Sequence, residues 1–196
     1  MKKLMLAVSL ALSATVAQAD IVSGPLTLST SGTVDFVGVN DVTGLTSAYT
    51  GTLLATEAVE FRVTFLGLEA GDTNFYVSNG SEVVGSAKGV VGIGQVFYFN
   101  VGAGVIDFGF GGSGTPGGVS NGSSAIAYNT TGLIDPTTGQ PFQFIIGFND
   151  SGSTDGDFDD YVIGVSAAVP VPAALPLMAS ALGMFGIARR RKSTVA

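Results

Sequence analysis

Apolar and polar residues alternate in short segments between residues 20 and 168, and residues that favour turns separate these segments. The clearest alternation lies in Ala58–Leu66, because successive side chains of an extended strand point to opposite faces. One face carries Val59, Phe61, Val63 and Phe65, and the other carries Glu60, Arg62 and Thr64. The pattern therefore predicts a strand with a buried face and a polar face.

The same pattern predicts further strands over residues 33–39, 49–54, 74–78, 95–101, 105–110, 143–149 and 161–167. Phe144–Phe148 is almost continuously apolar, which is typical of a central strand that is buried on both faces. Short strands separated by turns predict an all-β fold. We expect a single antiparallel, jelly-roll-like β-sandwich domain over residues 20–168, with Phe61, Phe65 and Phe148 in its core.

The segment Gly102–Asn121 interrupts this pattern, because glycine replaces many of the side chains that a strand would bury. We expect a mobile loop whose base is anchored by Phe108 and Phe110. The sequence favours a linker over a phosphate-binding loop, since no Gly-Lys-Ser/Thr sequence follows and the net charge opposes an anion.

Residues 1–19 have the pattern of a secretory signal peptide. Lys2 and Lys3 precede an apolar stretch over 4–16, and the small residues Ala17 and Ala19 form a cleavage site. We therefore expect signal peptidase to cut before Asp20, so that the protein is exported.

The last segment, residues 169–196, has three parts. A linker with two prolines (169–172) precedes an apolar helix (173–188), and a basic tail (189–196) begins with Arg189, Arg190, Arg191 and Lys192. The 16 apolar residues span about 24 Å as a helix, which is short against a hydrocarbon core of about 30 Å. The four cations keep the tail on the cytoplasmic side of the inner membrane, where they act as a membrane stop.

This order of proline motif, short apolar helix and arginine cluster resembles the C-terminal sorting signal of PEP-CTERM proteins, in its VPLPA-CTERM variant. The motif consists of Val169, Pro170, Val171, Pro172 and Ala173, with Val171 where the family has leucine. The resemblance implies a Gram-negative envelope and an exosortase-type sorting protease that cuts near this motif. The protein would then pass transiently through the inner membrane and reach the outer surface or the extracellular space.

The region between the two terminal signals is strongly acidic. Its cations are Arg62 and Lys88, and it holds all 15 acidic residues of the chain, which gives a net charge of −13. Such a charge repels nucleic acid, so nucleic-acid binding is excluded. The chain has no Cys and no His, which excludes disulfides, Ser-His-Asp and Cys-His catalysis, and His-containing zinc sites.

Five acidic residues lie within 11 positions just before the last predicted strand: Asp150, Asp155, Asp157, Asp159 and Asp160. Carboxylate oxygens without His or Cys favour Ca²⁺ over transition metals, so calcium is the one cofactor that the sequence indicates. The EF-hand pattern is absent, because the glycine and the glutamate that it requires are missing. A solvated loop without a metal is the alternative, and the sequence leaves both open.

The acidic segment also resembles a motif, often DxDFNDxVF, that closes β-sandwich domains with a DUF4114-like module in many PEP-CTERM proteins. The resemblance implies that Phe158 and Val162 point inward and that the Asp side chains lie at the edge of the sandwich. Upstream, Phe65–Asn74 resembles the FLGxEAGYxN segment of VPLPA-CTERM proteins. Glu69, Asp72 and Asn74 of this segment are potential oxygen ligands.

The sequence therefore favours a non-enzymatic protein of the cell surface or extracellular matrix, associated with exopolysaccharide and without catalytic residues. A Ca²⁺-dependent carbohydrate-binding module is the first alternative. Sugar-binding surfaces use exposed aromatic rings, and without Trp the candidates are Tyr49, Tyr76, Tyr98, Tyr128 and Tyr161. A glycosidase that uses two carboxylates is the distant alternative, because no carboxylate stands isolated in an apolar setting.

Overall fold

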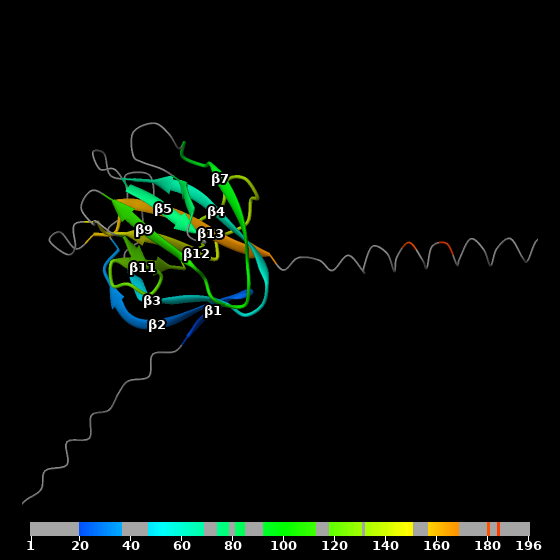
Figure 1. Ribbon diagram of the computed structural model, residues 1–196, viewed down its shortest axis with the longest axis horizontal. Coiled ribbons are helices and arrows are strands. Elements are labelled where there is room, and N and C mark those ends of the chain that lie inside the picture. The colour runs from blue at the N-terminus through cyan, green and yellow to red at the C-terminus, as the bar shows by residue number, and fades with distance from the viewer. Residues whose placement is uncertain are drawn as a thin grey trace, which may run out of the picture.

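The computed structural model describes residues 20–36, 47–68, 74–78, 81–84, 92–112, 118–130, 132–150 and 157–168, together with Ser180 and Met184. Between residues 20 and 168 the described chain is all-β, and its strands pair antiparallel in two sheets (Figure 1). The all-β prediction is thereby confirmed. The expected signal peptide (1–19) lies outside the described residues, as does the expected sorting segment (169–196) apart from Ser180 and Met184.

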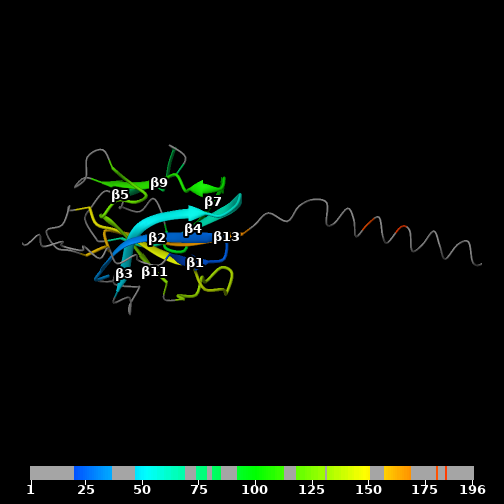
Figure 2. The same ribbon diagram turned by 90° about the horizontal axis from the view of Figure 1, so that it is seen from below.

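The large sheet holds nine strands. Their order is β1 (Ile21–Ser23), β2 (Leu26–Val34), β3 (Ala48–Ala55), β11 (Ile126–Asn129), β12 (Phe144–Phe148), β13 (Tyr161–Ala168), β4 (Val59–Gly67) and β7 (Val96–Val101), while β8 (Gly104–Val105) pairs with β3. The small sheet has the order β10 (Val119–Ser120), β9 (Phe108–Gly112), β5 (Asn74–Ser78) and β6 (Ser81–Val84). Figure 2 shows β5 and β9 in one layer and β2, β3 and β13 in the other.

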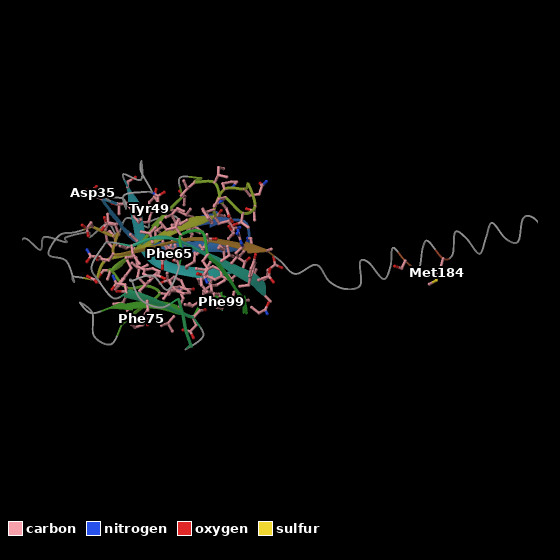
Figure 3. All side chains as sticks on the ribbon, turned by 90° about the horizontal axis from the view of Figure 1, so that it is seen from above. Asp35, Tyr49, Phe65, Phe75, Phe99 and Met184 are labelled. Atoms are coloured by element: carbon pink, nitrogen blue, oxygen red, sulfur yellow. The ribbon has the colours of Figure 1, made fainter. Side chains whose placement is uncertain are left out.

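Aromatic rings from both sheets form the core between the layers. Phe110 of the small sheet stacks on Phe148 of the large sheet, with ring centroids 5.2 Å apart, and lies 5.8 Å from the ring of Tyr161. Phe65 lies 5.1 Å from Tyr161, in the interior of the domain (Figure 3). The predicted core residues Phe61, Phe65 and Phe148 are exposed by 0%, 2% and 0%, so that prediction is confirmed.

A second apolar cluster covers the opposite face of the large sheet. It contains Phe36, Ala48, Leu66, Ala127, Phe142, Ile145, Phe158 and Val162. Gly147 makes room for it, because a Cβ atom there would collide with the ring of Phe36 and the carbonyl of Phe158. The polar face predicted for β4 is therefore wrong in part, since Arg62 and Thr64 are buried on this side of the sheet.

Most of the predicted strands are confirmed to within one or two residues, including the central position of Phe144–Phe148 between β11 and β13. The mobile loop predicted for Gly102–Asn121 is wrong where the structure describes it, because β8, β9 and β10 lie there. Phe108 and Phe110 are buried as expected, but they are strand residues. This position of β9 is occupied by glycine, Gly111, because the ring of Phe75 lies where a Cβ atom would stand and a side chain would collide with it.

Asn121 links the end of the small sheet to the large sheet through its side-chain amide. Its Oδ1 accepts hydrogen bonds from the Leu53 N–H at 2.9 Å and from the Tyr128 hydroxyl at 2.8 Å. Its Nδ2 donates to the carbonyls of Leu53 and Ile106, both at 2.8 Å. One partly buried amide is thus fully paired and joins the segments that contain Leu53, Ile106 and Tyr128.

Replacing Phe148 with Ala should lower the free energy of unfolding by about 3–5 kcal/mol, because the ring is fully buried and its removal leaves a cavity. Urea unfolding followed by circular dichroism measures the change. Val22→Ala is the control: this side chain is 68% exposed, so we expect a change within about 0.5 kcal/mol. A loss below about 1 kcal/mol for Phe148→Ala would contradict the assignment of this ring to the core.

Two tyrosine hydroxyls differ in a way that unfolding experiments can detect. Tyr128→Phe should cost about 1 kcal/mol, because its hydroxyl donates to Asn121. Tyr161→Phe should leave the free energy of unfolding unchanged or raise it by up to about 1 kcal/mol, since this buried hydroxyl has no hydrogen-bond partner within the described part of the chain. Equal losses from the two substitutions would contradict this reading of the core.

Candidate functional site

The acidic hairpin, defined as residues 149–160, connects β12 to β13 at one end of the large sheet. Phe148 pairs with Tyr161, so the two arms of the hairpin leave the sheet side by side. Asp150 lies on the first arm, and Asp157, Asp159 and Asp160 lie on the second. Asp155 lies outside the described residues. The structure thus brings together the flanks of the predicted calcium segment.

The two acids nearest the sheet are buried. Asp150 and Asp160 are exposed by 4% and 2%, and the backbone N–H of Asp150 donates to Oδ2 of Asp160 at 2.5 Å. Phe158 and Val162 are also buried, as the motif implies, but they join the cluster on the outer face of the large sheet. The motif also implies that its Asp side chains lie at the edge of the sandwich, and Asp160, which belongs to the motif, is buried there.

Asn74 of β5 meets the acidic hairpin from the small sheet. Its Nδ2 donates to the carbonyl of Asp160 at 3.0 Å, and the side chain is fully buried. Its Oδ1 has no hydrogen-bond partner in the described ranges. Glu69 and Asp72, the other two expected oxygen ligands of this segment, lie outside them. Among the residues that the structure describes, no three acidic side chains form a group that could hold a metal.

A second polar site lies on the outer face of β4, where Arg62 forms an ion pair with Asp135. Nη2 of Arg62 donates to Oδ1 of Asp135 at 3.2 Å, and Nη1 contacts Oδ2. Both residues are buried, with exposed fractions of 7% for Arg62 and 0% for Asp135. The charge of the arginine is therefore compensated inside the protein and is not displayed on the surface.

Asp135 also organises the loop that follows β11. Its Oδ1 accepts a hydrogen bond from the Thr137 N–H at 2.8 Å, and its carbonyl accepts one from Gly139 at 2.8 Å. Ile134 pairs with Pro141, which closes the loop into a tight hairpin. The ion pair thus fastens this loop against the face of the sheet.

A cavity of about 310 Å³ lies between this loop and the sheet. We call it the Arg62 pocket, and its lining consists of Glu60, Arg62, Thr138, Gln140, Pro141, Gln143, Ser166, Ala167 and Ala168. Strands β13, β4 and β7 run side by side at this place (Figure 1). Cross-strand neighbours place Ser166 and Tyr98 on the two sides of Arg62.

The five tyrosines occupy different environments. Tyr76, Tyr128 and Tyr161 are fully buried, and burial raises the pKa of each of these hydroxyls well above its ordinary value. They stay neutral and cannot contact a ligand from solvent. Tyr98 is 57% exposed and is the large aromatic side chain that the described surface displays. The guanidinium carbon of Arg62 lies 6.0 Å from the centroid of its ring.

Comparison of the chain with protein-family models, with curated proteins and with solved structures gave no match. None of the described residues belongs to a helix that is long and apolar enough to cross a membrane.

The sequence analysis singled out the acidic hairpin but not the Arg62 pocket. One signal was present, because Arg62 is the sole arginine between residues 20 and 168 and lies in an otherwise regular strand. Its partner could not be found in the same way, since Asp135 is 73 residues away in an ordinary turn sequence.

Proposed function

We propose that the chain is an exported, non-enzymatic protein of the cell surface or extracellular matrix of a Gram-negative bacterium, associated with exopolysaccharide. It is cut by signal peptidase before Asp20 and by an exosortase-type protease near Val169–Ala173. The observation that carries the proposal is the position of both cuts relative to the strands. β1 begins at Ile21, one residue after the first cut, and β13 ends at Ala168, one residue before the sorting motif.

The position of β13 supports removal of the tail after folding. This strand lies between β12 and β4, and its first five residues are buried, so a cut after Ala168 leaves this strand and its pairing with both neighbours intact. The last residue of the strand is exposed. On this proposal the sorting protease cuts beyond this residue, and the product keeps every described strand. On this proposal residues 20–168 form a single jelly-roll-like sandwich domain.

We also propose that the acidic hairpin binds Ca²⁺. The described acids supply hard oxygen atoms, and the unpaired Oδ1 of the buried Asn74 adds a neutral one from the facing sheet. Asp155 also belongs to the proposed ligand set. A bound cation would offset the repulsion among five carboxylates that the sequence places within 11 residues.

The carbohydrate-binding alternative gains support from one observation, the exposed ring of Tyr98. The glycosidase alternative gains none, because the lining of the Arg62 pocket holds one carboxylate, Glu60, whereas the reaction needs a pair.

Processing can be tested directly in the native cells. The surface-exposed or released protein should begin at Asp20 and lack Arg189–Lys192, which mass spectrometry of the intact protein measures. Substituting Pro170 and Pro172 with Ala should leave an uncut form in the inner membrane, because the extended linker is no longer enforced. A surface protein that still carries its basic tail would refute the proposal.

Calcium binding should raise the melting temperature. An ion that binds only the folded state at about one hundred times its Kd stabilises that state by about 2.7 kcal/mol, which corresponds to several degrees for a domain of this size. Differential scanning calorimetry with Ca²⁺, and with Mg²⁺ at equal ionic strength, measures the effect. Mg²⁺ should do less, because it requires a tighter octahedral shell.

The matched variants for this test differ only in where two charges are removed. Asp157→Asn with Asp159→Asn should abolish the calcium response, whereas Glu57→Gln with Asp107→Asn removes two exposed charges elsewhere and should preserve it. Equal responses to the two ions, or a response that survives the hairpin substitutions, would show that the hairpin is a solvated loop.

A further inference from the structure

We propose that the Arg62 pocket and the ring of Tyr98 form a binding site for a neutral polysaccharide. The inference deepens the proposed function, because it names the class of polysaccharide that the protein binds. It rests on the proposed function, which places the protein in contact with extracellular polysaccharide. The site lies on the outer face of β13, β4 and β7.

The first argument is the exposure of Tyr98. Apolar rings are normally withdrawn from water in this protein, and Tyr98 is the aromatic side chain among the described residues that is largely exposed, at 57%. Arg62 lies beside its ring, at 6.0 Å from the centroid, and is itself fixed by Asp135. The ring is therefore held in place by a buried group, which suits a platform on which the apolar face of a sugar ring can stack.

The second argument is the chemistry of the pocket. Thr138 and Ser166 supply hydroxyls and Gln140 supplies an amide, groups that both donate and accept hydrogen bonds. Glu60 adds a carboxylate acceptor at the exposed rim. A ligand rich in hydroxyl groups presents donors and acceptors in the same mixture. A cavity of about 310 Å³ lies at the lower end of the usual range for small-molecule sites, which suits a short stretch of a glycan chain.

The third argument is charge, which selects a neutral polymer over an anionic one. Asp135 compensates the charge of Arg62, so the formal charge displayed at the pocket is that of Glu60. The region between the terminal signals carries a net charge of −13, which repels polyanions as a whole. An anionic polysaccharide would therefore meet repulsion without a compensating cation in the pocket.

The fourth argument explains the buried ion pair. Two buried charges often stabilise a fold no better than apolar residues of similar size, so their presence calls for a specific role. Here Asp135 holds the loop that carries Thr138 and Gln140, and Arg62 holds the ring of Tyr98. The pair thus positions both walls of the site from beneath, and Arg62 and Asp135 are positioning residues.

The test is native affinity electrophoresis of the full-length chain, purified in a detergent that has no sugar headgroup. Dextran, laminarin and galactomannan serve as neutral probes, and alginate serves as the anionic probe. At least one neutral polysaccharide should retard the protein, at low and at high salt and with EDTA present, whereas alginate should not. Retardation by none of the neutral polymers, or by alginate alone, would overturn the proposal.

The matched variants locate the site. Tyr98→Ala should weaken retardation by roughly tenfold or more, because it removes the central anchor, and Glu60→Gln should weaken it to a lesser degree. Tyr98→Phe keeps the ring and should bind like the unmodified chain, as should Val105→Ala, which removes an exposed apolar side chain on β8. Thermal melting checks that each variant is folded. Binding that survives Tyr98→Ala would overturn the proposal, and EDTA-sensitive binding of this kind would place the site at the acidic hairpin.

This outcome is separate from that of the processing experiment. The masses of the exported protein do not depend on polysaccharide binding, and the electrophoresis does not depend on export. Loss of one proposal therefore leaves the other to be judged on its own result.

Discussion

The rest of the structure depends on the aromatic layer between the two sheets. The chain has no disulfide, and residues 20–168 hold two cations against 15 acids, so attraction between surface charges cannot hold the sheets together. Phe110 and Tyr76 of the small sheet pack onto the aromatic rings of the large sheet, and this burial supplies the main favourable free energy. The strands of the small sheet are short, and three of the five residues of β9 are glycines without a side chain to bury. The small sheet is ordered because its rings have partners in the other layer.

The second face of the large sheet explains how a chain with few charges arranges its polar groups. Phe36, Phe142 and Phe158 cover part of this face, so β12 and β13 are buried on both sides. Next to this cover, Arg62 and Asp135 are buried together and fasten the loop over β4. Removing one partner of such a pair leaves an uncompensated buried charge, at a typical cost of about 3–5 kcal/mol. The pair therefore fixes the position of the loop more firmly than surface contacts would.

Sequence periodicity predicted the strands whose alternation is regular, such as Ala58–Leu66 and Asn74–Ser78, because burial on one face leaves a period of two residues. It predicted only the first three residues of β9 and missed β10, because glycines are present there for a steric reason that only the packed structure reveals. Gly111 admits the ring of Phe75, and the sequence shows only a missing side chain. The acidic hairpin was predicted because its acids are adjacent in the chain. The Arg62 pocket was not, because Glu60, Tyr98 and Gln140 come from segments that meet only through the register of β4 with β7 and the turn at Asp135.

The two candidate sites need different properties from the same acidic surface. A cation at the acidic hairpin is favoured by the negative potential of residues 20–168 as a whole, and its binding should weaken as salt screens that potential. The binding of a neutral polymer at the Arg62 pocket is not strengthened by this potential and should not change with the salt concentration. The potential does decide which polymers approach, because the net negative charge of the domain repels polyanions but not uncharged glycans. Acidity and the binding of neutral glycans are therefore compatible. Together they would let such a protein bind uncharged glycans without adhering to polyanions in its surroundings.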